Sequence, residues 1–426
     1  MCAPNKMKSE KMSPRLRQGM IYGATSVALL ALSATLTIPH LQSRRDALEC
    51  DVMCYGSLTS ARSALSVIGA AMMGRLSDSA GPNSRKMCML IGSVATLVGM
   101  LIAAYTYSIQ GLWMSMIPGA LFQQNFNILK ALLSDLQDEG STPSDRASAV
   151  GMLGMAAGLA FMIGPLAGAT VLKTFEQANA VGMIFVVASL AIVFMLPNPT
   201  RTTSQKEKNK NKGVISFVNV KAARTPGAIL LMAVRTCMAL AFHVFQTIWS
   251  VALKTRFDFG PADYGKFMSF IGLTYALSQG FLAKFLLESL GGNKSDKVRV
   301  RMILGCCITL GVGRYVAFQT ESLVVVYVLF ASIVTALGMV NTILTADTSY
   351  LASSDEIGSL FGLLASVESG AGMIGPALGG ALAYVHPVQA PLFCVVGLYI
   401  VVYILVSWGY EQLVLKTKKT VSGKID

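Results

Sequence analysis

Residues 361–380 read FGLLASVESGAGMIGPALGG, and residues 150–169 read VGMLGMAAGLAFMIGPLAGA. The two stretches align without a gap: MIGP occurs at 162–165 and again at 373–376, and Gly168 matches Gly379. The offset, 373 − 162 = 211, is almost half of the 426-residue chain. Glycines in apolar segments let helices approach closely in a bilayer. The match therefore indicates two related halves that each contain one glycine-rich helix.

The second stretch also contains Gly370-x-Gly372-x-x-Gly375, the spacing of a dinucleotide-binding fingerprint. That fingerprint requires a preceding strand and an acidic residue about 20 positions later. Here the glycines interrupt one apolar run, and the next acidic residue is Glu411. We therefore interpret these glycines as helix-packing positions.

The composition is typical of a membrane protein. Apolar residues make up 53% of the chain and charged residues only 13%, whereas a soluble protein carries about 25% charged residues. The mean hydropathy is +0.57. We predict an all-α membrane protein with twelve transmembrane helices in two pseudo-symmetric six-helix bundles, since a span needs about 20 apolar residues. The predicted spans are 18–40, 55–76, 87–106, 111–134, 148–171, 178–197, 227–250, 263–287, 302–319, 322–345, 357–383 and 389–409.

The charge distribution predicts the orientation and the domain limits. The net charge is +13, and its Lys and Arg residues gather in the tails and in the long segment between the halves. Lys/Arg bias fixes topology, so both termini are expected in the cytoplasm of a multi-pass protein of the plasma membrane or an internal membrane. The expected parts are a tail at 1–17, bundles at 18–197 and 225–410, a basic linker at 198–224 and a tail at 411–426.

Several other classes of site find no support in the sequence. The three histidines and eight cysteines form no metal-binding pattern, and no cofactor is expected. No fold signature accompanies the basic clusters, so nucleic-acid binding is not expected. Cys50 and Cys54 flank the expected outer end of the second span, where a disulfide forms if that side is oxidising.

The loop after the second span carries a recognisable motif, GRLSDSAGPNSRK at 74–86. It resembles the G-x-L-x-D-R-x-G-R-[RK] signature of the major facilitator superfamily, although Ser79 replaces an Arg and three residues are inserted before Arg85. The paired MIGP stretches resemble the antiporter motif of the drug:proton exchange branch. Residues 261–280 and 355–367 are similar to organic-cation-transporter-like solute carriers and tetracycline exporters.

The resemblance implies an alternating-access carrier and a set of gating residues. Asp78 is expected to sit against the start of the eleventh span, where a helix N-terminus stabilises a carboxylate, and to pair with Arg146. Gly74 is expected to allow close helix packing beside it. The complete gating set is Gly74, Asp78, Arg85, Arg146, Gly164, Pro165, Gly168, Gly375 and Pro376.

Glu368 is a carboxylate inside an apolar span. It lies eleven residues from Ile357, or about 16 Å along a helix, and half the hydrocarbon thickness is about 15 Å. Its counterpart in the first half is Ala157. A charge at this depth is costly and normally faces a cavity or a partner, and burial favours the neutral carboxyl. The sequence therefore predicts a site for a proton or an organic cation, with a structural hydrogen bond as the alternative.

Two polar stripes are candidate neighbours of Glu368. Helical spacing places Arg235, His243 and Gln246 on one side of the seventh span. The fourth span offers Gln123, Asn127 and Lys130, of which Lys130 can also extend to the membrane surface. The resemblance implies that these spans line the central cavity. A lone amide can equally join two helices.

The leading functional hypothesis is secondary active transport of a small organic solute, an amphiphilic cation exchanged for protons, by a monomer. A facilitative uniporter is the alternative, and a non-transporting receptor or scaffold is a third possibility. An enzyme is not expected, since no G-x-S-x-G or H-E-x-x-H motif occurs, and the absence of a Walker motif argues against ATP as the energy source.

Overall fold

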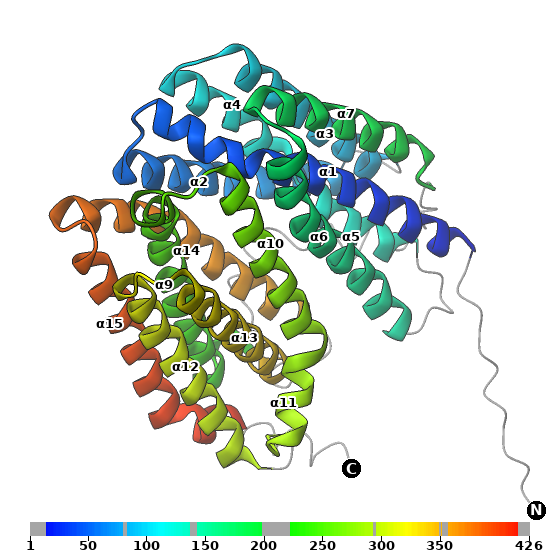
Figure 1. Ribbon diagram of the computed structural model, residues 1–426. Coiled ribbons are helices and arrows are strands. Elements are labelled where there is room, and N and C mark those ends of the chain that lie inside the picture. The colour runs from blue at the N-terminus through cyan, green and yellow to red at the C-terminus, as the bar shows by residue number, and fades with distance from the viewer. Residues whose placement is uncertain are drawn as a thin grey trace, which may run out of the picture.

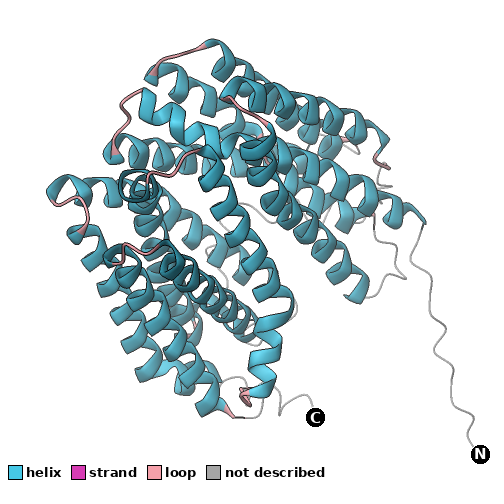
Figure 2. Cartoon of the chain, in the orientation of Figure 1, coloured by secondary structure: helices cyan, strands magenta, loops and turns pink. Residues whose placement is uncertain are grey.

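A computed structural model describes residues 14–79, 83–136, 143–197, 222–292, 295–348, 351 and 357–415. Every regular element in these ranges is helical, as Figure 2 shows. The helices form two bundles that lie side by side (Figure 1).

The first bundle contains six spans. Five of them are single helices, and the fourth is split into two pieces. In chain order the helices are α1 (Pro14–Ala47), α2 (Val52–Ser79), α3 (Ser84–Tyr105), α4 (Ile109–Phe122), α5 (Asn125–Asp135), α6 (Pro143–Val171) and α7 (Phe175–Met195).

The second bundle repeats this arrangement after a short 3-10 turn, η2 (Ala222–Arg224). Its eighth and twelfth spans contain π-helical segments. The elements are α9 (Pro226–Phe257), α10 (Pro261–Leu277), η3 (Ser278–Leu282), α11 (Ala283–Ser289), α12 (Asp296–Gln319), α13 (Leu323–Thr348), α14 (Ile357–Val385), α15 (Gln389–Leu405) and η4 (Val406–Leu415).

The predicted fold class is confirmed, with two corrections to its helices. The described ranges contain eight helices that are long and apolar enough to cross a membrane by themselves. The span expected at 111–134 is broken at Gln123 and Gln124, where the Gln124 side chain donates to the Ser66 carbonyl instead of continuing one apolar surface. The span expected at 263–287 is α10, η3 and α11 in sequence.

Helical structure extends into both of the expected tails. Helix α1 begins at Pro14, inside the expected tail, and η4 continues to Leu415, four residues beyond the expected start of the last tail. The expected basic linker lies outside the described residues, apart from 222–224.

The repeated glycines pack α6 and α14 in equivalent ways. Within the first bundle, an added Cβ at Gly164 would lie 1.9 Å from Thr35 Oγ1 of α1, and one at Gly168 would lie 2.2 Å from the Leu36 carbonyl oxygen. Within the second bundle, a Cβ at Gly375 would lie 2.6 Å from the His243 Cβ of α9. Only glycine permits these approaches. The fifth span thus packs on the first as the eleventh packs on the seventh.

The same two helices also join the bundles. Pro165 of α6 lies against Gly265 of α10, and Pro376 of α14 lies against Gly56 of α2. Two hydrogen bonds reinforce these contacts: the Ser269 hydroxyl donates to the Met162 carbonyl at 2.6 Å, and the Ala377 N–H donates to the Ser60 hydroxyl at 2.8 Å.

All of these contacts between the bundles lie toward one end of the molecule. This end carries the α1–α2 turn at 48–51 and the α9–α10 turn at 258–260. We call it the disulfide end, because Cys50 and Cys54 form a disulfide there. In Figure 1 the bundles meet where α2 faces α14 and diverge toward the start of α1 and the end of α11. The protein is therefore closed at the disulfide end.

Candidate solute and proton site

Glu368 and Arg235 form an ion pair between α14 and α9. Arg235 Nη1 donates to Glu368 Oε1 at 2.8 Å. Arg235 Nη2 donates to the Thr345 hydroxyl of α13, also at 2.8 Å. The site thus connects three helices of the second bundle through one guanidinium.

The depth and exposure of the pair suit a site that exchanges ligands. Arg235 lies nine residues from the start of α9 at Pro226, or about 14 Å along the helix. The Glu368 side chain is 42% exposed, whereas that of Arg235 is 13% exposed. The carboxylate is therefore accessible while the guanidinium is held between helices.

The start of α9 is well defined by its own sequence. Pro226 occupies the first turn, where its missing N–H is no loss, and the Thr225 hydroxyl caps the helix by accepting from the Ala228 N–H. This cap fixes the register of α9 and hence the depth of Arg235.

His243 and Gln246 lie further along α9 than Arg235. The His243 ring is within 3.1 Å of an added Cβ at Gly372, one helical turn from Glu368. It is half-buried against the glycine-rich surface of α14. His243 therefore helps to pack α9 on α14, one helical turn beyond Glu368. Gln246 is also half-buried.

The predicted stripe of the fourth span lies at the break between α4 and α5. Gln123 ends α4, and the exposed Asn127 donates to the Gln124 side chain at 3.3 Å. Lys130 is half-buried, and its Nζ lies 4.1 Å from the centre of the Phe126 ring. The described residues provide no carboxylate partner for Lys130.

A second charged cluster, not singled out from the sequence, is fully buried near the same site. Arg299 of α12 binds Asp347 of α13 through Nε at 2.9 Å and Nη2 at 2.7 Å, and the Tyr410 hydroxyl donates to Asp347 at 2.7 Å. Asp347 is 1% exposed. The predicted spans begin at 302 and end at 345, so Arg299 and Asp347 lie just outside them. The sequence feature that could have indicated this pair is the opposite charge of two residues next to the ends of neighbouring predicted spans.

The gating residues are only partly described. The side chains of Asp78 and Arg146 lie outside the described residues, so their predicted pairing remains a prediction. Arg85 is buried, and Lys86 donates to the Phe194 and Leu196 carbonyls at the end of α7. An added Cβ at Gly74 would meet no atom of the described residues within 4 Å, so the close packing expected there stays a prediction. Gly74 lies at the end where the bundles diverge.

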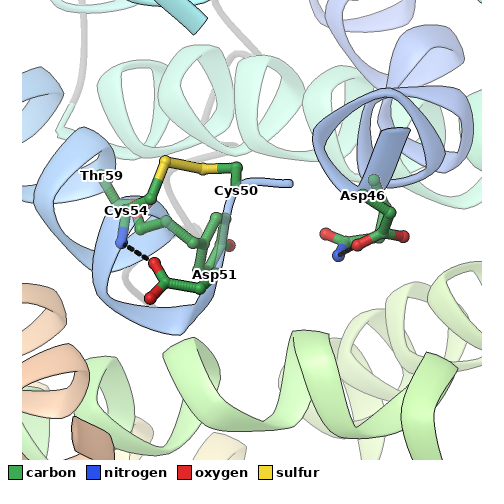
Figure 3. The surroundings of a disulfide bond; sticks show 7 residues. Asp46, Cys50, Asp51, Cys54 and Thr59 are labelled. Carbon is green, nitrogen blue, oxygen red and sulfur yellow. Dashed lines mark hydrogen bonds between the residues drawn. A yellow bond between two sulfur atoms is a disulfide. The ribbon is translucent and has the colours of Figure 1, made fainter. Parts of the chain in front are cut away.

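The disulfide end has its own covalent and ionic contacts. Cys50 and Cys54 form a disulfide that joins the turn after α1 to the first turn of α2. Asp51 caps α2 by accepting a hydrogen bond from the Cys54 N–H at 2.7 Å (Figure 3). The same figure labels Asp46, near the end of α1. Asp46 Oδ2 lies 2.9 Å from Lys254 Nζ of α9, an ion pair between the bundles.

The described ranges contain no group of three or more His, Cys, Asp or Glu side chains suited to hold a metal ion. At the site itself the structure places the Arg235–Glu368 pair and the Thr345 hydroxyl.

The chain belongs to the major facilitator superfamily, whose family model matches residues 18–376. Among curated relatives, it is 24% identical to mouse solute carrier family 22 member 18, over 92% of this chain and 96% of that protein. It is 23% identical to the class B tetracycline resistance protein of Escherichia coli, over 78% of this chain and 79% of that one.

Solved structures show the same fold. The human organic anion transporter MFSD10 (TETRAN) superposes with a TM-score of 0.66 at 20% identity, over 92% of this chain and 100% of that one. A bacterial homologue of the lysosomal transporter Spinster gives 0.67 at 14% identity, over 96% and 95%. The chain is thus a membrane transporter of this superfamily.

The ion pair yields a stability prediction. Arg235→Ala leaves Glu368 without its partner, and we expect a loss of about 1–3 kcal/mol. This is less than the about 3–5 kcal/mol of a fully buried pair, because solvent screens the exposed carboxylate. Thermal unfolding in detergent measures the change. The neutral double variant Arg235→Gln/Glu368→Gln should unfold at a higher temperature than Arg235→Ala. Equal destabilisation of both would contradict a stabilising pair.

Proposed function

We propose that the protein is a secondary transporter that exchanges a small organic solute for protons, with Glu368 as the group that binds the proton. The observation that supports this most is the half-exposed Glu368 carboxylate held by Arg235 at mid-depth. An ionisable group at this depth is costly and usually functional.

The exchange follows from competition for one carboxylate. Ionised Glu368 is held by Arg235, or by a cationic solute that approaches its exposed side. A proton neutralises Glu368 and removes the attraction for either cation. Solute and proton therefore bind in turn, and each crossing carries one of them. Since α9, α13 and α14 of one chain supply the whole site, we propose that a monomer suffices.

A solute that carries an anionic group is a second candidate. Lys130 has no carboxylate partner among the described residues. Arg235 loses its negatively charged partner when Glu368 is protonated, and an anionic group of the solute can replace it. Human MFSD10, which has a similar fold, is an organic anion transporter. In this version the proton on Glu368 frees Arg235 to bind the solute.

Glu368→Gln provides the test of coupling. The variant keeps the size and hydrogen-bonding capacity of the side chain but cannot titrate. In liposomes with a pH gradient and a panel of organic cations and anions, we expect accumulation to fall at least about tenfold, while solute–solute exchange persists. Ser369→Ala, whose hydroxyl bonds only the Ala365 carbonyl, is the control.

If Glu368→Gln accumulated solute along the pH gradient as well as the wild type, Glu368 would have no role in proton coupling. If the wild type itself did not accumulate solute against its gradient, the protein would be a uniporter. Uptake of anions that depends on Lys130 would favour the second candidate.

We propose that transport uses alternating access, with this conformation closed at the disulfide end. Opening at that end requires the Asp46–Lys254 pair and the two hydrogen bonds between bundles to separate. Lys254 is 46% exposed, so this ion pair contributes about 0.2–1 kcal/mol. The packing of α6 on α10 and of α14 on α2, with its hydrogen bonds, therefore contributes most of the stability of the closed end.

Breaking the ion pair should therefore loosen the disulfide end slightly. We expect Asp46→Asn or Lys254→Gln to accelerate hydrogen exchange in the segments 52–60 and 376–380 by about 1.5- to 5-fold, which corresponds to the above energies. The charge-swapped double variant Asp46→Lys/Lys254→Asp should restore the wild-type rate. Lys266→Gln, which disrupts a pair within α10 alone, should have no effect there. Equal rates in all variants would exclude the ion pair from closure.

We further propose that the disulfide end faces the outside or a lumen and that both termini are cytoplasmic. Disulfides persist in oxidising compartments, and the Lys/Arg bias of the sequence independently favours the same orientation.

Cysteine labelling tests this orientation. In sealed vesicles with the cytoplasmic face inward, a membrane-impermeant maleimide should label Cys50 and Cys54 only after an impermeant reductant is added. The Cys50→Ser/Cys54→Ser variant, which retains the other six cysteines, should show no such increase. If the maleimide labelled Cys50 and Cys54 only after the vesicles were permeabilised, the proposed orientation would be wrong and the disulfide end would face the cytoplasm.

A further inference from the structure

A groove of about 580 Å³ lies between α12 and α13, outside the transport site. Ile308, Val312 and Val328 are exposed apolar side chains on the same two helices, so this region faces hydrocarbon. Its lining includes Met302, Gly305 and Thr309 of α12 and Ala331, Ser332 and Thr335 of α13.

The wall of the groove is mostly apolar, and two of its three side-chain hydroxyl groups are hydrogen-bonded within their own helices. The Thr309 hydroxyl donates to the Gly305 carbonyl, and the Ser332 hydroxyl donates to the Val328 carbonyl. An added Cβ at Gly305 would meet no atom of the part of the chain that the structure describes within 4 Å, so the glycine leaves open space. The groove therefore presents a surface suited to a hydrocarbon chain.

Two basic residues lie at the end of the groove away from the disulfide end. Lys297, Arg301, Gly305 and Thr309 are spaced by four residues and follow one row of α12. Lys297 and Arg301 are both exposed and make no ion pair or hydrogen bond with the described residues. Long side chains on a helix lean toward its N-terminus, which places both charges at the membrane surface below the groove.

The nearby carboxylates do not cancel this charge. Asp296 lies nine positions from Gly305 and hence about 180° around α12. Glu288, near the end of α11, is exposed and contributes one negative charge against two positive ones. The mouth of the groove is therefore basic.

We propose that this groove binds one anionic phospholipid. Its acyl chain lies along Gly305 and Thr309, and its phosphate binds Arg301 and Lys297. Charged hydrogen bonds from guanidinium to phosphate are strong and directional. Under the proposed orientation this mouth lies in the cytoplasmic leaflet, which is rich in anionic lipid. The site is independent of the transported solute.

Native mass spectrometry of the detergent-purified protein, with phosphatidylglycerol and phosphatidylcholine of equal chain length, tests the proposal. We expect the wild type to retain one phosphatidylglycerol with at least about fivefold preference. Gly305→Leu fills the groove and should abolish retention of both lipids. Gly397→Leu is the matched control, because its Cβ also meets nothing within 4 Å, and it should retain lipid as the wild type does.

The charge variant separates headgroup from chain. Lys297→Gln/Arg301→Gln leaves the groove open, so it should keep one lipid but lose the preference for phosphatidylglycerol. Lys173→Gln/Lys266→Gln removes two charges near the disulfide end and should keep the preference. Retention by Gly305→Leu equal to Gly397→Leu, or an unchanged preference in Lys297→Gln/Arg301→Gln, would overturn the proposal. So would a Gly305→Leu variant that changes the oligomeric mass rather than the bound lipid, because the groove would then be a subunit interface.

Discussion

The close approach of α6 and α14 to their neighbours is the constraint on which the rest of the structure depends. Each helix uses glycines to contact one helix of its own bundle and a proline turn to contact one helix of the other. Because bilayer lipid offers no hydrophobic driving force between helices, such close packing supplies much of their association. The position of Glu368 relative to α9, and the closure of the disulfide end, both follow from how α14 packs.

Charges inside the bundles are stabilised in two different ways. The pairs Arg235–Glu368 and Arg299–Asp347 use opposite charges, of which the second is fully enclosed. Arg314, at 2% exposure, instead donates to the Tyr399 hydroxyl at 2.7 Å and lies 5.2 Å from the centre of the Phe245 ring. A buried cation can be held by an aromatic face and hydroxyl groups. Of these three groups, only the Arg235–Glu368 pair combines charge with an exposed side chain. The candidate site therefore lies there.

The geometry provides a route by which the proposed proton binding at Glu368 would influence the helices around it. Arg235 connects Glu368 on α14 to Thr345 on α13, and Asp347 lies two residues further along α13 in the enclosed cluster. A change in the charge of Glu368 alters the partners of one guanidinium that touches three helices. Such a shared side chain is a physical route for coupling between a bound proton and helix packing.

The sequence by itself determined the helical membrane class, the internal repeat and the depth of Glu368, because apolar run length and helical rise are local properties. It also singled out Arg235 as a candidate neighbour of Glu368. Only the tertiary structure identified Thr345, Asp347 with Arg299, and Asp46 with Lys254, and showed which end is closed. These contacts join residues between 48 and 254 − 46 = 208 positions apart, so they depend on the register and rotation of packed helices. Helical periodicity gives the side of a helix on which a residue lies, whereas packing alone decides which helix that side meets.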